Sequence, residues 1–255
     1  MTQDRMTRAR ATLFFEMFPG LPRQGPGDAT STLRALSLVP GVGAQTRVLI
    51  PGCGTGLEAR LIAQHARVRI LAIDNHPPYV EEFNREADAL GYADRVEARV
   101  GDMHRLEFPS GLFDLVWCEG AIYVVGFDTG LREWRHLLAA GGHIALTEVC
   151  WTKPDPPPEC AAFWAQEYPA ISDVAARLRV ITECGYEPVA HFPLPASAWW
   201  DDYYGPLQQK ILQFRDRHDG ETDAQQLADS VQREIDVWKQ YSDFYAYEFF
   251  VMRRT

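Results

Sequence analysis

The stretch Pro51-Gly52-Cys53-Gly54-Thr55-Gly56 decides the fold, because it joins an apolar run to a helical pattern. The run before it, Arg47-Val48-Leu49-Ile50, is apolar without alternation, as in a strand that is buried on both faces. The segment after it, Leu57 to Ala66, has helical spacing. Residues without a Cβ let the chain turn tightly and let a ligand approach the helix N-terminus, where N–H groups favour a carboxylate or a phosphate. The sequence therefore predicts a strand, a ligand-binding loop and a helix in succession.

The alternation of strands and helices continues downstream, which is typical of a parallel sheet with crossover helices. The further elements expected up to residue 150 are strands over Ile70–Ile73, Val96–Val100, Leu112–Cys118 and His143–Cys150, and helices over Pro77–Leu90 and Leu131–Ala140, the last of which is stopped by Gly141-Gly142.

Beyond residue 150 the pattern changes to helices around two further strands. A rigid connector, Pro154-Asp155-Pro156-Pro157-Pro158, comes first. After it we expect helices over Glu159–Tyr168 and Ser172–Glu183, strands over Tyr186–Phe192 and Phe244–Met252, and some fifty residues of helical spacing between those strands. A hairpin turn would suffice there, so we predict one domain over residues 1–255 in which residues 1–40, 151–185 and 195–243 form a lid or cap. A cap that only thickens the fold fits equally well.

The composition favours an intracellular protein with a small-molecule substrate. The 255 residues carry 35 acidic and 25 basic side chains, and residues 195–243 hold ten of the acidic and five of the basic ones. This net charge of −10 disfavours a nucleic-acid partner, because phosphate binding needs clustered Lys and Arg. No stretch approaches the ~20 apolar residues of a membrane span. Five cysteines without a C-x-x-C pair predict reduced thiols in a cytoplasm and no metal site.

Two carboxylates after later strands support the prediction of a ligand-binding site at the glycine loop. Asp74 ends the second expected strand, where a carboxylate can accept hydrogen bonds from both hydroxyls of a ribose. Asp102 follows the third strand in Gly101-Asp102-Met103. The spacing G-x-G-x-G departs from the G-x-G-x-x-G of dinucleotide-binding proteins, and an acidic residue after the third strand has no standard role with NAD. The pattern therefore favours another nucleoside cofactor.

In these residues the chain resembles the class I S-adenosylmethionine (SAM) dependent methyltransferases, over about Thr46 to Cys150 and the terminal strand. The resemblance implies an α/β, Rossmann-like, mostly parallel sheet of seven strands in the order 3-2-1-4-5-7-6, with helices on both faces and a helical lid insertion before the last, antiparallel strand. It implies SAM as cofactor and S-adenosyl-L-homocysteine as product, with Asp102 on the adenine amino group and the Met103 N–H on a ring nitrogen. The other cofactor-binding residues that it implies are Gly52, Cys53, Gly54, Gly56, Asp74 and Asn75.

The chain is most similar to small-molecule enzymes of the ubiquinone/menaquinone C-methyltransferase and glycine/sarcosine N-methyltransferase type. Arg23-Gln24-Gly25-Pro26-Gly27 and Glu119-Gly120-Ala121-Ile122-Tyr123 look like motifs of a bacterial subgroup. Arg23 is then expected to pair with the cofactor carboxylate, and a surface arginine in a turn is the alternative.

One position departs from the family pattern, which has Asp or Glu two residues before the first glycine of the loop. This chain has Ile50 there. Either Glu119 or a water takes the place of the missing carboxylate near the cofactor amino group, or the affinity for the cofactor is reduced. Thiopurine and thiol methyltransferases also have an apolar residue before Pro-x-Cys-Gly, so the difference is compatible with activity.

Candidates for catalysis follow the fourth and fifth strands, because ligands of open α/β sheets lie beyond the C-terminal strand ends. Positioning of the nucleophile supplies most of the rate of methyl transfer, and a general base is needed for some acceptors only. Glu119 and Tyr123 are the predicted catalytic residues; a structural hydrogen bond and a half-buried core tyrosine are the alternatives. Glu148 is expected to be structural, and His143 to be the exposed start of its strand.

Aromatic residues concentrate in the segments expected to form the lid. Most of them are expected to pack between lid and sheet. A subset would line an apolar or cation-binding substrate pocket, since aromatic faces attract ammonium and sulfonium groups. The predicted pocket residues are Phe18, Trp151, Trp199 and Tyr203.

These observations predict a SAM-dependent methyltransferase, of the EC 2.1.1 class, that acts on a small metabolite through an O, N, S or C acceptor. A catalytically silent SAM-binding protein and an NAD-dependent oxidoreductase are the alternatives. The run Asn75-His76-Pro77-Pro78-Tyr79 resembles the N-P-P-Y of DNA amino-methyltransferases. That motif belongs after the fourth strand, whereas this run follows the second, which argues against nucleic-acid methylation.

Overall fold

The computed structural model describes residues 13–255, which divide into two compact units. Among the described residues, unit 1 contains residues 13–26, Val149–Asp173 and Pro195–Ala246; unit 2 contains Gly27–Glu148, Val174–Leu194 and Tyr247–Thr255. The lid role of residues 1–40, 151–185 and 195–243 stays a prediction, and the first twelve residues lie outside the described part of the chain.

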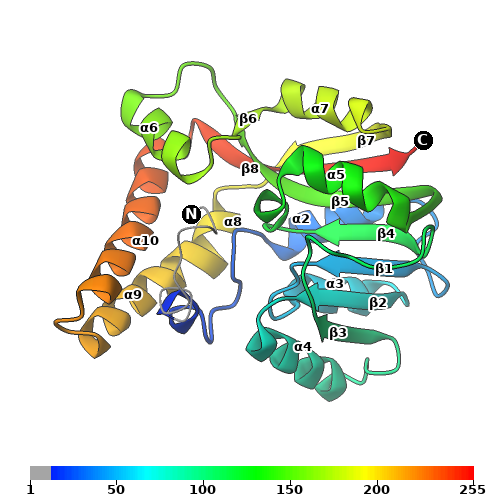
Figure 1. The fold of residues 1–255 in the computed structure, drawn as a ribbon, viewed down its shortest axis with the longest axis horizontal. Coiled ribbons are helices and arrows are strands. Elements are labelled where there is room, and N and C mark those ends of the chain that lie inside the picture. The colour runs from blue at the N-terminus through cyan, green and yellow to red at the C-terminus, as the bar shows by residue number, and fades with distance from the viewer. Residues whose placement is uncertain (1–12) are drawn as a thin grey trace. The chain divides into compact units, whose positions relative to one another are not determined.

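One sheet of eight strands carries the fold (Figure 1). The order is β3-β2-β1-β4-β5-β8-β7, and β6 pairs with β5 off this path. Strands β1 to β5 pair in parallel, whereas β7 and β8 are antiparallel to each other. The predicted order is confirmed apart from the two-residue strand β6, which was not predicted. The strands are β1 (Arg47–Pro51), β2 (Arg69–Asp74), β3 (Val96–Val100), β4 (Phe113–Cys118), β5 (Leu138–Trp151), β6 (Ser172–Asp173), β7 (Tyr186–Pro193) and β8 (Tyr245–Arg254).

Helices cover both faces of the sheet in unit 2. The strand order reverses between β1 and β4, so right-handed crossovers place the helices of the two halves on opposite faces. Helices α5 and α7 pack together, and Figure 1 shows α5 in front of the sheet, while α2 packs against α3. The central strands β1 and β4 are accordingly buried on both sides. These helices are α2 (Ala29–Ser37), α3 (Leu57–His65), α4 (Pro77–Ala89), α5 (Phe127–Trp134) and α7 (Val174–Glu183).

The helix predicted over Leu131–Ala140 is wrong at both ends. The chain is helical over Phe127–Trp134 and in a short 3₁₀ turn, and β5 already begins at Leu138. The glycines that were expected to end the helix lie inside the strand, where Gly141 has a φ of +72°. They form a bulge, because Phe113 is opposite Leu138 and Leu115 is opposite His143. His143 is therefore not an exposed strand start but a buried residue, and burial lowers its pKa.

A helix was predicted over Ser172–Glu183, but its first two residues form the strand β6, which pairs with Cys150 and Trp151. Its remainder, α7, carries a buried ion pair. Arg177 donates to the Glu148 carboxylate at 2.6 Å, and its guanidinium lies 4.7 Å from the centre of the Phe127 ring. The structural role expected for Glu148 is confirmed by this contact.

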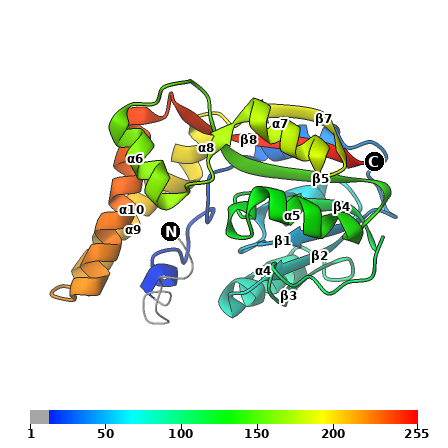
Figure 2. The same cartoon turned by 45° about the horizontal axis from the view of Figure 1, so that its top comes forward.

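Unit 1 is mostly helical, as expected for the residues between the last two strands. Helices α9 and α10 pack against each other, and Figure 2 shows the pair with α6 close to the end of α10. Within residues 13–255 no helix is long and apolar enough to cross a membrane. The helical elements are α6 (Pro158–Glu167), α8 (Ser197–Trp199), the π-helical turn η4 (Trp200–Tyr204), α9 (Gly205–Arg217) and α10 (Thr222–Tyr241).

We predict that Arg177→Met destabilises the protein by about 3–5 kcal/mol, because it leaves the Glu148 carboxylate buried without its cation. Arg179→Met, on the exposed side of the same helix, is the control and should change the free energy of unfolding by less than about 0.5 kcal/mol. Urea unfolding measures both. Equal stability of the two variants would show that the ion pair contributes nothing.

Candidate functional site

The glycine loop between β1 and α3 is packed so tightly that side chains would not fit at two of its positions. Gly56 immediately precedes α3 with a φ of +81°, and a Cβ there would lie 2.1 Å from the ring of Phe83 on α4. A Cβ at Gly52 would lie 2.6 Å from the Cβ of Ala121, which follows β4. The loop therefore brings bare backbone to the C-terminal end of the sheet, as the sequence predicted for a ligand-binding turn.

Asp74 ties this loop to the end of β2. One carboxylate oxygen accepts the Gly54 N–H at 2.8 Å, and the other accepts the His76 N–H at 2.9 Å. Burial raises the pKa of Asp74, while these backbone hydrogen bonds oppose that shift. A carboxylate has about four acceptor sites, so Asp74 can accept a further hydrogen bond from a ligand hydroxyl. Its neighbour Asn75 is exposed.

The residues after β3 lie beside the glycine loop. The Met103 sulfur would be 3.6 Å from a Cβ at Gly52, so Met103 and Ala121 both face that glycine. Asp102 is exposed and accepts two hydrogen bonds from His104, from its N–H at 2.9 Å and from its Nδ1 at 2.8 Å. The hydrogen bond from the His104 backbone is the largest cause of the lowered pKa of Asp102. The structure thus brings the ends of β1, β2, β3 and β4 to one place.

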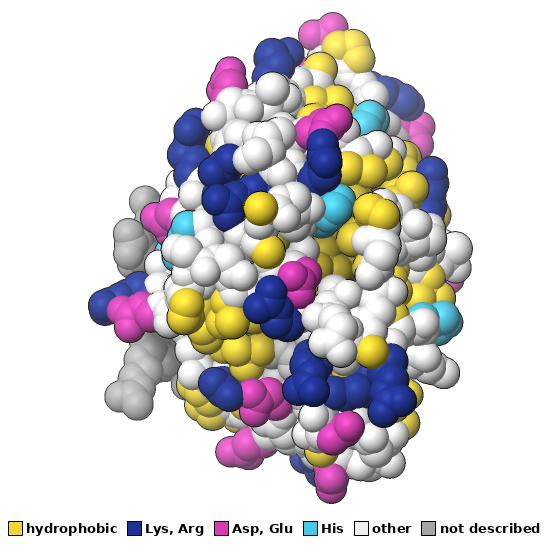
Figure 3. Space-filling view, turned by 90° about the vertical axis from the view of Figure 1, so that its right-hand side faces the viewer, with side chains coloured by type: hydrophobic (Ala, Val, Ile, Leu, Met, Phe, Trp, Pro, Cys, Tyr) yellow, Lys and Arg dark blue, Asp and Glu magenta, His cyan; other side chains and the backbone are white. Residues whose placement is uncertain are grey.

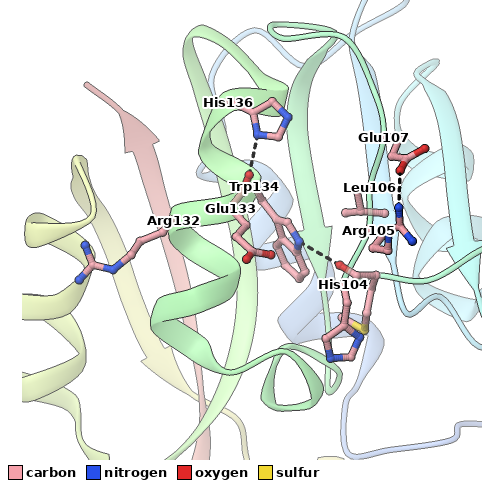
Figure 4. A pocket seen from close by; sticks show the side chains of 9 residues that line it. His104, Arg105, Leu106, Glu107, Arg132, Glu133, Trp134 and His136 are labelled. Atoms are coloured by element: carbon pink, nitrogen blue, oxygen red, sulfur yellow. Dashed lines mark hydrogen bonds and ion pairs between the residues drawn. The ribbon is translucent and has the colours of Figure 1, made fainter.

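A hollow of about 410 Å³ opens between the segment Met103–Glu107 and the segment Arg132–His136 (Figure 4). Figure 4 shows the Trp134 indole pointing toward the loop of His104, where its N–H donates to the Met103 carbonyl at 3.3 Å. Trp134 was not predicted as a site residue. The contact joins residues that are 31 positions apart in the chain, so no pattern of neighbouring residues predicts it.

Glu119 is held firmly at the end of β4. Its Oε1 accepts hydrogen bonds from the Thr32 hydroxyl at 2.8 Å and from the Trp117 indole N–H at 2.9 Å, and both donors are buried. The structural hydrogen bond that we expected as the alternative role of Glu119 is therefore present, and its catalytic role stays a prediction. For Tyr123 the alternative was a half-buried position in the core, and this alternative is wrong because the residue is 44% exposed.

Ile50 is fully buried in β1, so it presents no polar group to a ligand. Cys53 is buried in the loop, and burial raises the pKa of its thiol well above the usual range, which disfavours a reactive thiolate. A carboxylate that was not predicted lies close by. Glu58, in the first turn of α3, is buried beside the loop. Burial is the main cause of the raised pKa of Cys53 and Cys118, and the charge of Glu58 adds to both shifts. Its position directly after the glycine loop is the signal that would have identified it.

The predicted substrate-pocket residues belong to unit 1 and are mostly buried. The ring of Trp199 stacks on Trp238 with centroids 6.4 Å apart, and Tyr203 stacks on Tyr204 at 4.9 Å. Trp151 meets the Tyr245 ring edge-on at 6.4 Å.

Two predicted residues from the N-terminal segment also lie in unit 1. Phe18 packs on Phe14 at 4.6 Å. Arg23 is 6% exposed, so the alternative of a surface arginine is wrong.

A second hollow, of about 460 Å³, lies at the opposite end of the strands, beside Thr46, which precedes β1, and Asp114, the second residue of β4. There Arg47 donates three hydrogen bonds to the Asp114 carboxylate, two from its side chain at 2.9 and 3.0 Å and one from its backbone N–H at 2.8 Å. Figure 3 shows the face on the side of the C-terminus, where basic and acidic side chains are interspersed. Among residues 13–255 no group of three His, Cys, Asp or Glu side chains is placed to hold a metal ion.

Residues 48–142 match the family model described as a methyltransferase domain. Phosphoethanolamine N-methyltransferase 3 of Arabidopsis thaliana is 28% identical over 155 residues, which are 60% of this chain and 30% of that protein. Sterol 24-C-methyltransferase of Eremothecium gossypii is 29% identical over 114 residues, which are 44% of this chain and 31% of that protein. Each match thus covers less than a third of the length of the relative.

A solved structure extends the likeness in fold to the whole chain. The SAM-dependent methyltransferase from Thiobacillus denitrificans, in complex with S-adenosyl-L-homocysteine, superposes with a TM-score of 0.82 over 98% of this chain and 99% of its own, at 19% identity. The domain match, the sheet order and the glycine loop with its two carboxylates agree. Residues 48–142 of this chain are thus similar to methyltransferase domains, and the chain has the fold of a SAM-dependent methyltransferase.

Proposed function

We propose that this protein transfers a methyl group from SAM to a small molecule. The observation that carries the proposal is the meeting of the glycine loop, Asp74 and the Met103 segment at the C-terminal ends of β1, β2 and β3. The bare backbone at Gly52 and Gly56 leaves room for a cofactor and points the N-terminus of α3 at it. These residues fit SAM, which supplies the methyl group when it is bound.

Each part of the cofactor has a proposed holder in this chain. Asp74, with its remaining acceptor capacity, receives the ribose hydroxyls, and Asn75 lies next to it. Asp102 and the Met103 N–H bind the adenine edge. The loop Gly52-Cys53-Gly54-Thr55-Gly56 lies along the rest of the molecule, and Arg23 and Glu119 are the proposed contacts of its amino-acid part. We add Glu58, whose buried carboxylate supplies negative charge near the loop where Ile50 does not.

The acceptor is proposed to be a small molecule that is held by Phe18, Trp151, Trp199 and Tyr203. Alignment of the acceptor atom with the sulfonium supplies most of the rate, worth roughly 7–11 kcal/mol of the barrier. Glu119 or Tyr123 takes the proton where the acceptor carries one. Relatives named for an N and a C acceptor match this chain about equally, so the acceptor atom stays open. The five free, buried cysteines support a reducing compartment, the cytoplasm.

A catalytically silent SAM-binding protein is the second candidate, and Ile50 is the observation in its favour. An incubation with methyl-labelled SAM and a panel of small amines, thiols, phenols and heterocycles tests the proposal. We expect one labelled product. Binding of S-adenosyl-L-homocysteine without any labelled product across the panel would favour the silent protein.

We predict that Asp74→Ala weakens the binding of S-adenosyl-L-homocysteine at least tenfold, or about 1.4 kcal/mol. The substitution removes the acceptor for the ribose and also frees the Gly54 N–H that shapes the loop. Calorimetric titration measures the affinity. An unchanged affinity would remove Asp74 from the cofactor site.

Gly56→Ala should abolish cofactor binding, because the added Cβ meets the Phe83 ring at a position whose φ is positive. Gly91→Ala is a matched control, since Gly91 has a φ of +71° and no heavy atom within 4 Å of an added Cβ. It carries the same backbone strain without the clash, so it should bind the cofactor normally. The idea that crowding shapes the loop is refuted if both variants bind alike.

Glu119→Gln separates charge from shape at the end of β4, because the amide oxygen can still accept from Thr32 and Trp117. If Glu119 is the general base, kcat should fall about 10²-fold or more while the fold is kept. Turnover of the labelled substrate gives the rate, and circular dichroism checks the fold. Full activity would exclude Glu119 as a base.

A further inference from the structure

The second hollow, at the N-terminal ends of the parallel strands, lies beside the bulge in β5. Where β5 passes Asp114 of β4, four of its residues, Ala139–Gly142, stand opposite that single residue. All four are alanine or glycine, so their side chains fill little space. Residues of the loop 39–46, His143 and Arg253 also line the hollow, and all of these residues belong to unit 2. Its volume of about 460 Å³ lies within the range of small-molecule pockets, roughly 300–1,000 Å³.

His143 is a buried polar side chain that lines this hollow. It is 7% exposed, and within residues 13–255 its imidazole makes no hydrogen bond. A neutral imidazole has one donor and one acceptor, and buried polar groups normally have partners. Neither ring nitrogen is fully enclosed by the protein, so the ring keeps access to the hollow. A ligand in the hollow would supply the missing partner.

Arg253 lies on the same face of the sheet as His143. Leu115 is the register partner of His143, and Trp117 shares its face because side chains two residues apart in a strand do so. The Trp117 ring meets Phe249 of β8 at 5.5 Å, and Arg253 follows Phe249 by four residues. Burial is the main cause of the lowered pKa of His143, and the charge of Arg253 adds to it. The imidazole and the guanidinium are therefore neighbours.

The two charged residues that line the hollow differ in what they can still bind. Asp114 accepts three hydrogen bonds from Arg47, which occupy most of the four acceptor sites of a carboxylate. Arg253 donates through Nε and Nη2 to one oxygen of Glu187, and within the described residues its Nη1 has no acceptor. The side chains of this second pair are 51% and 56% exposed, so the pair is weak. The hollow thus has more to offer an anion than a cation.

We propose that this hollow binds a small organic carboxylate, whose anionic group lies between His143 and Arg253. Its apolar body rests against Val39 and Val42 of the loop after α2. The carboxylate accepts hydrogen bonds from the imidazole N–H and from the remaining N–H groups of the guanidinium. Its charge offsets the repulsion between the guanidinium and a protonated imidazole. The neighbouring charge of Asp114 disfavours an anion with more than one charge.

The proposed carboxylate site is separate from the proposed cofactor site, because it lies at the other end of the strands. Strand β4 has six residues, so at about 3.3 Å per residue its two ends are roughly 17 Å apart. A small ligand beside Asp114 does not reach Glu119 or the glycine loop. The carboxylate site therefore stands whether or not the chain transfers methyl groups.

Benzoate and benzamide test the site on the full chain, since they have nearly the same shape and only benzoate is an anion at neutral pH. We expect calorimetry to show saturable binding of benzoate, at least tenfold tighter than the binding of benzamide. S-adenosyl-L-homocysteine should not displace it. Equal affinity of the two probes, no binding of benzoate, or displacement of benzoate by S-adenosyl-L-homocysteine would overturn the proposal.

Arg253→Gln removes the cation and keeps an amide that can donate to Glu187. It should weaken benzoate binding at least tenfold and leave benzamide unaffected. Arg99→Gln is the matched control, because Arg99 is also an exposed strand arginine that pairs with a carboxylate, and its loss changes the net charge equally. Benzoate binding that is unchanged in Arg253→Gln, or reduced equally in Arg99→Gln, contradicts the site.

The imidazole of His143 reports on the site without any substitution. A carboxylate bound beside it stabilises the imidazolium, so saturation with benzoate should raise the pKa of His143. Titration of the ring protons by nuclear magnetic resonance measures this pKa with benzoate and with benzamide. A pKa that benzoate leaves where benzamide leaves it would show that the anion binds elsewhere.

Discussion

The two oxygens of Asp74 each accept a backbone N–H, one from the glycine loop and one from the start of α4. This pairing fixes the loop against the end of β2, and the loop in turn begins α3. The Phe83 ring of α4 fills the place of a side chain at Gly56. One carboxylate and one ring thus determine how β1, β2 and their helices meet, and the proposed cofactor site is the surface that they leave.

The topology of the sheet explains why this surface is available. The chain turns from one half of the sheet to the other between β1 and β4, so the loops after these strands diverge and leave a crevice at their C-terminal ends. Glu119 follows β4, where two buried donors orient its carboxylate. The bulge in β5 and the buried pair of Glu148 with Arg177 support the sheet behind it.

Local patterns were sufficient to predict most strands of the sheet and the glycine loop. An apolar run, a loop of glycines and a helical spacing each lie within a few residues, and the resemblance to a known family supplied the order of the strands. The start of β5 could not be predicted in this way. Gly141 and Gly142 are typical of a helix end, and only the pairing with β4 makes them a bulge.

The features that sequence reasoning missed depend on contacts between distant residues. The indole of Trp134 reaches Met103, and Thr32 reaches Glu119 across 87 residues. Glu234 resembles any acidic residue on an amphipathic helix until the buried hydroxyl of Tyr204 is seen to face it. Such pairs follow from packing, which no spacing along the chain encodes.

The most direct test of the account is a calorimetric titration of the unmodified protein with S-adenosyl-L-homocysteine, and in parallel with NADH. The cradle formed by the glycine loop, Asp74 and Met103 predicts saturable binding of S-adenosyl-L-homocysteine at one site per chain and no heat of binding with NADH. Saturable binding of NADH, with no response to S-adenosyl-L-homocysteine, would contradict the assignment of this site to a SAM-dependent methyltransferase.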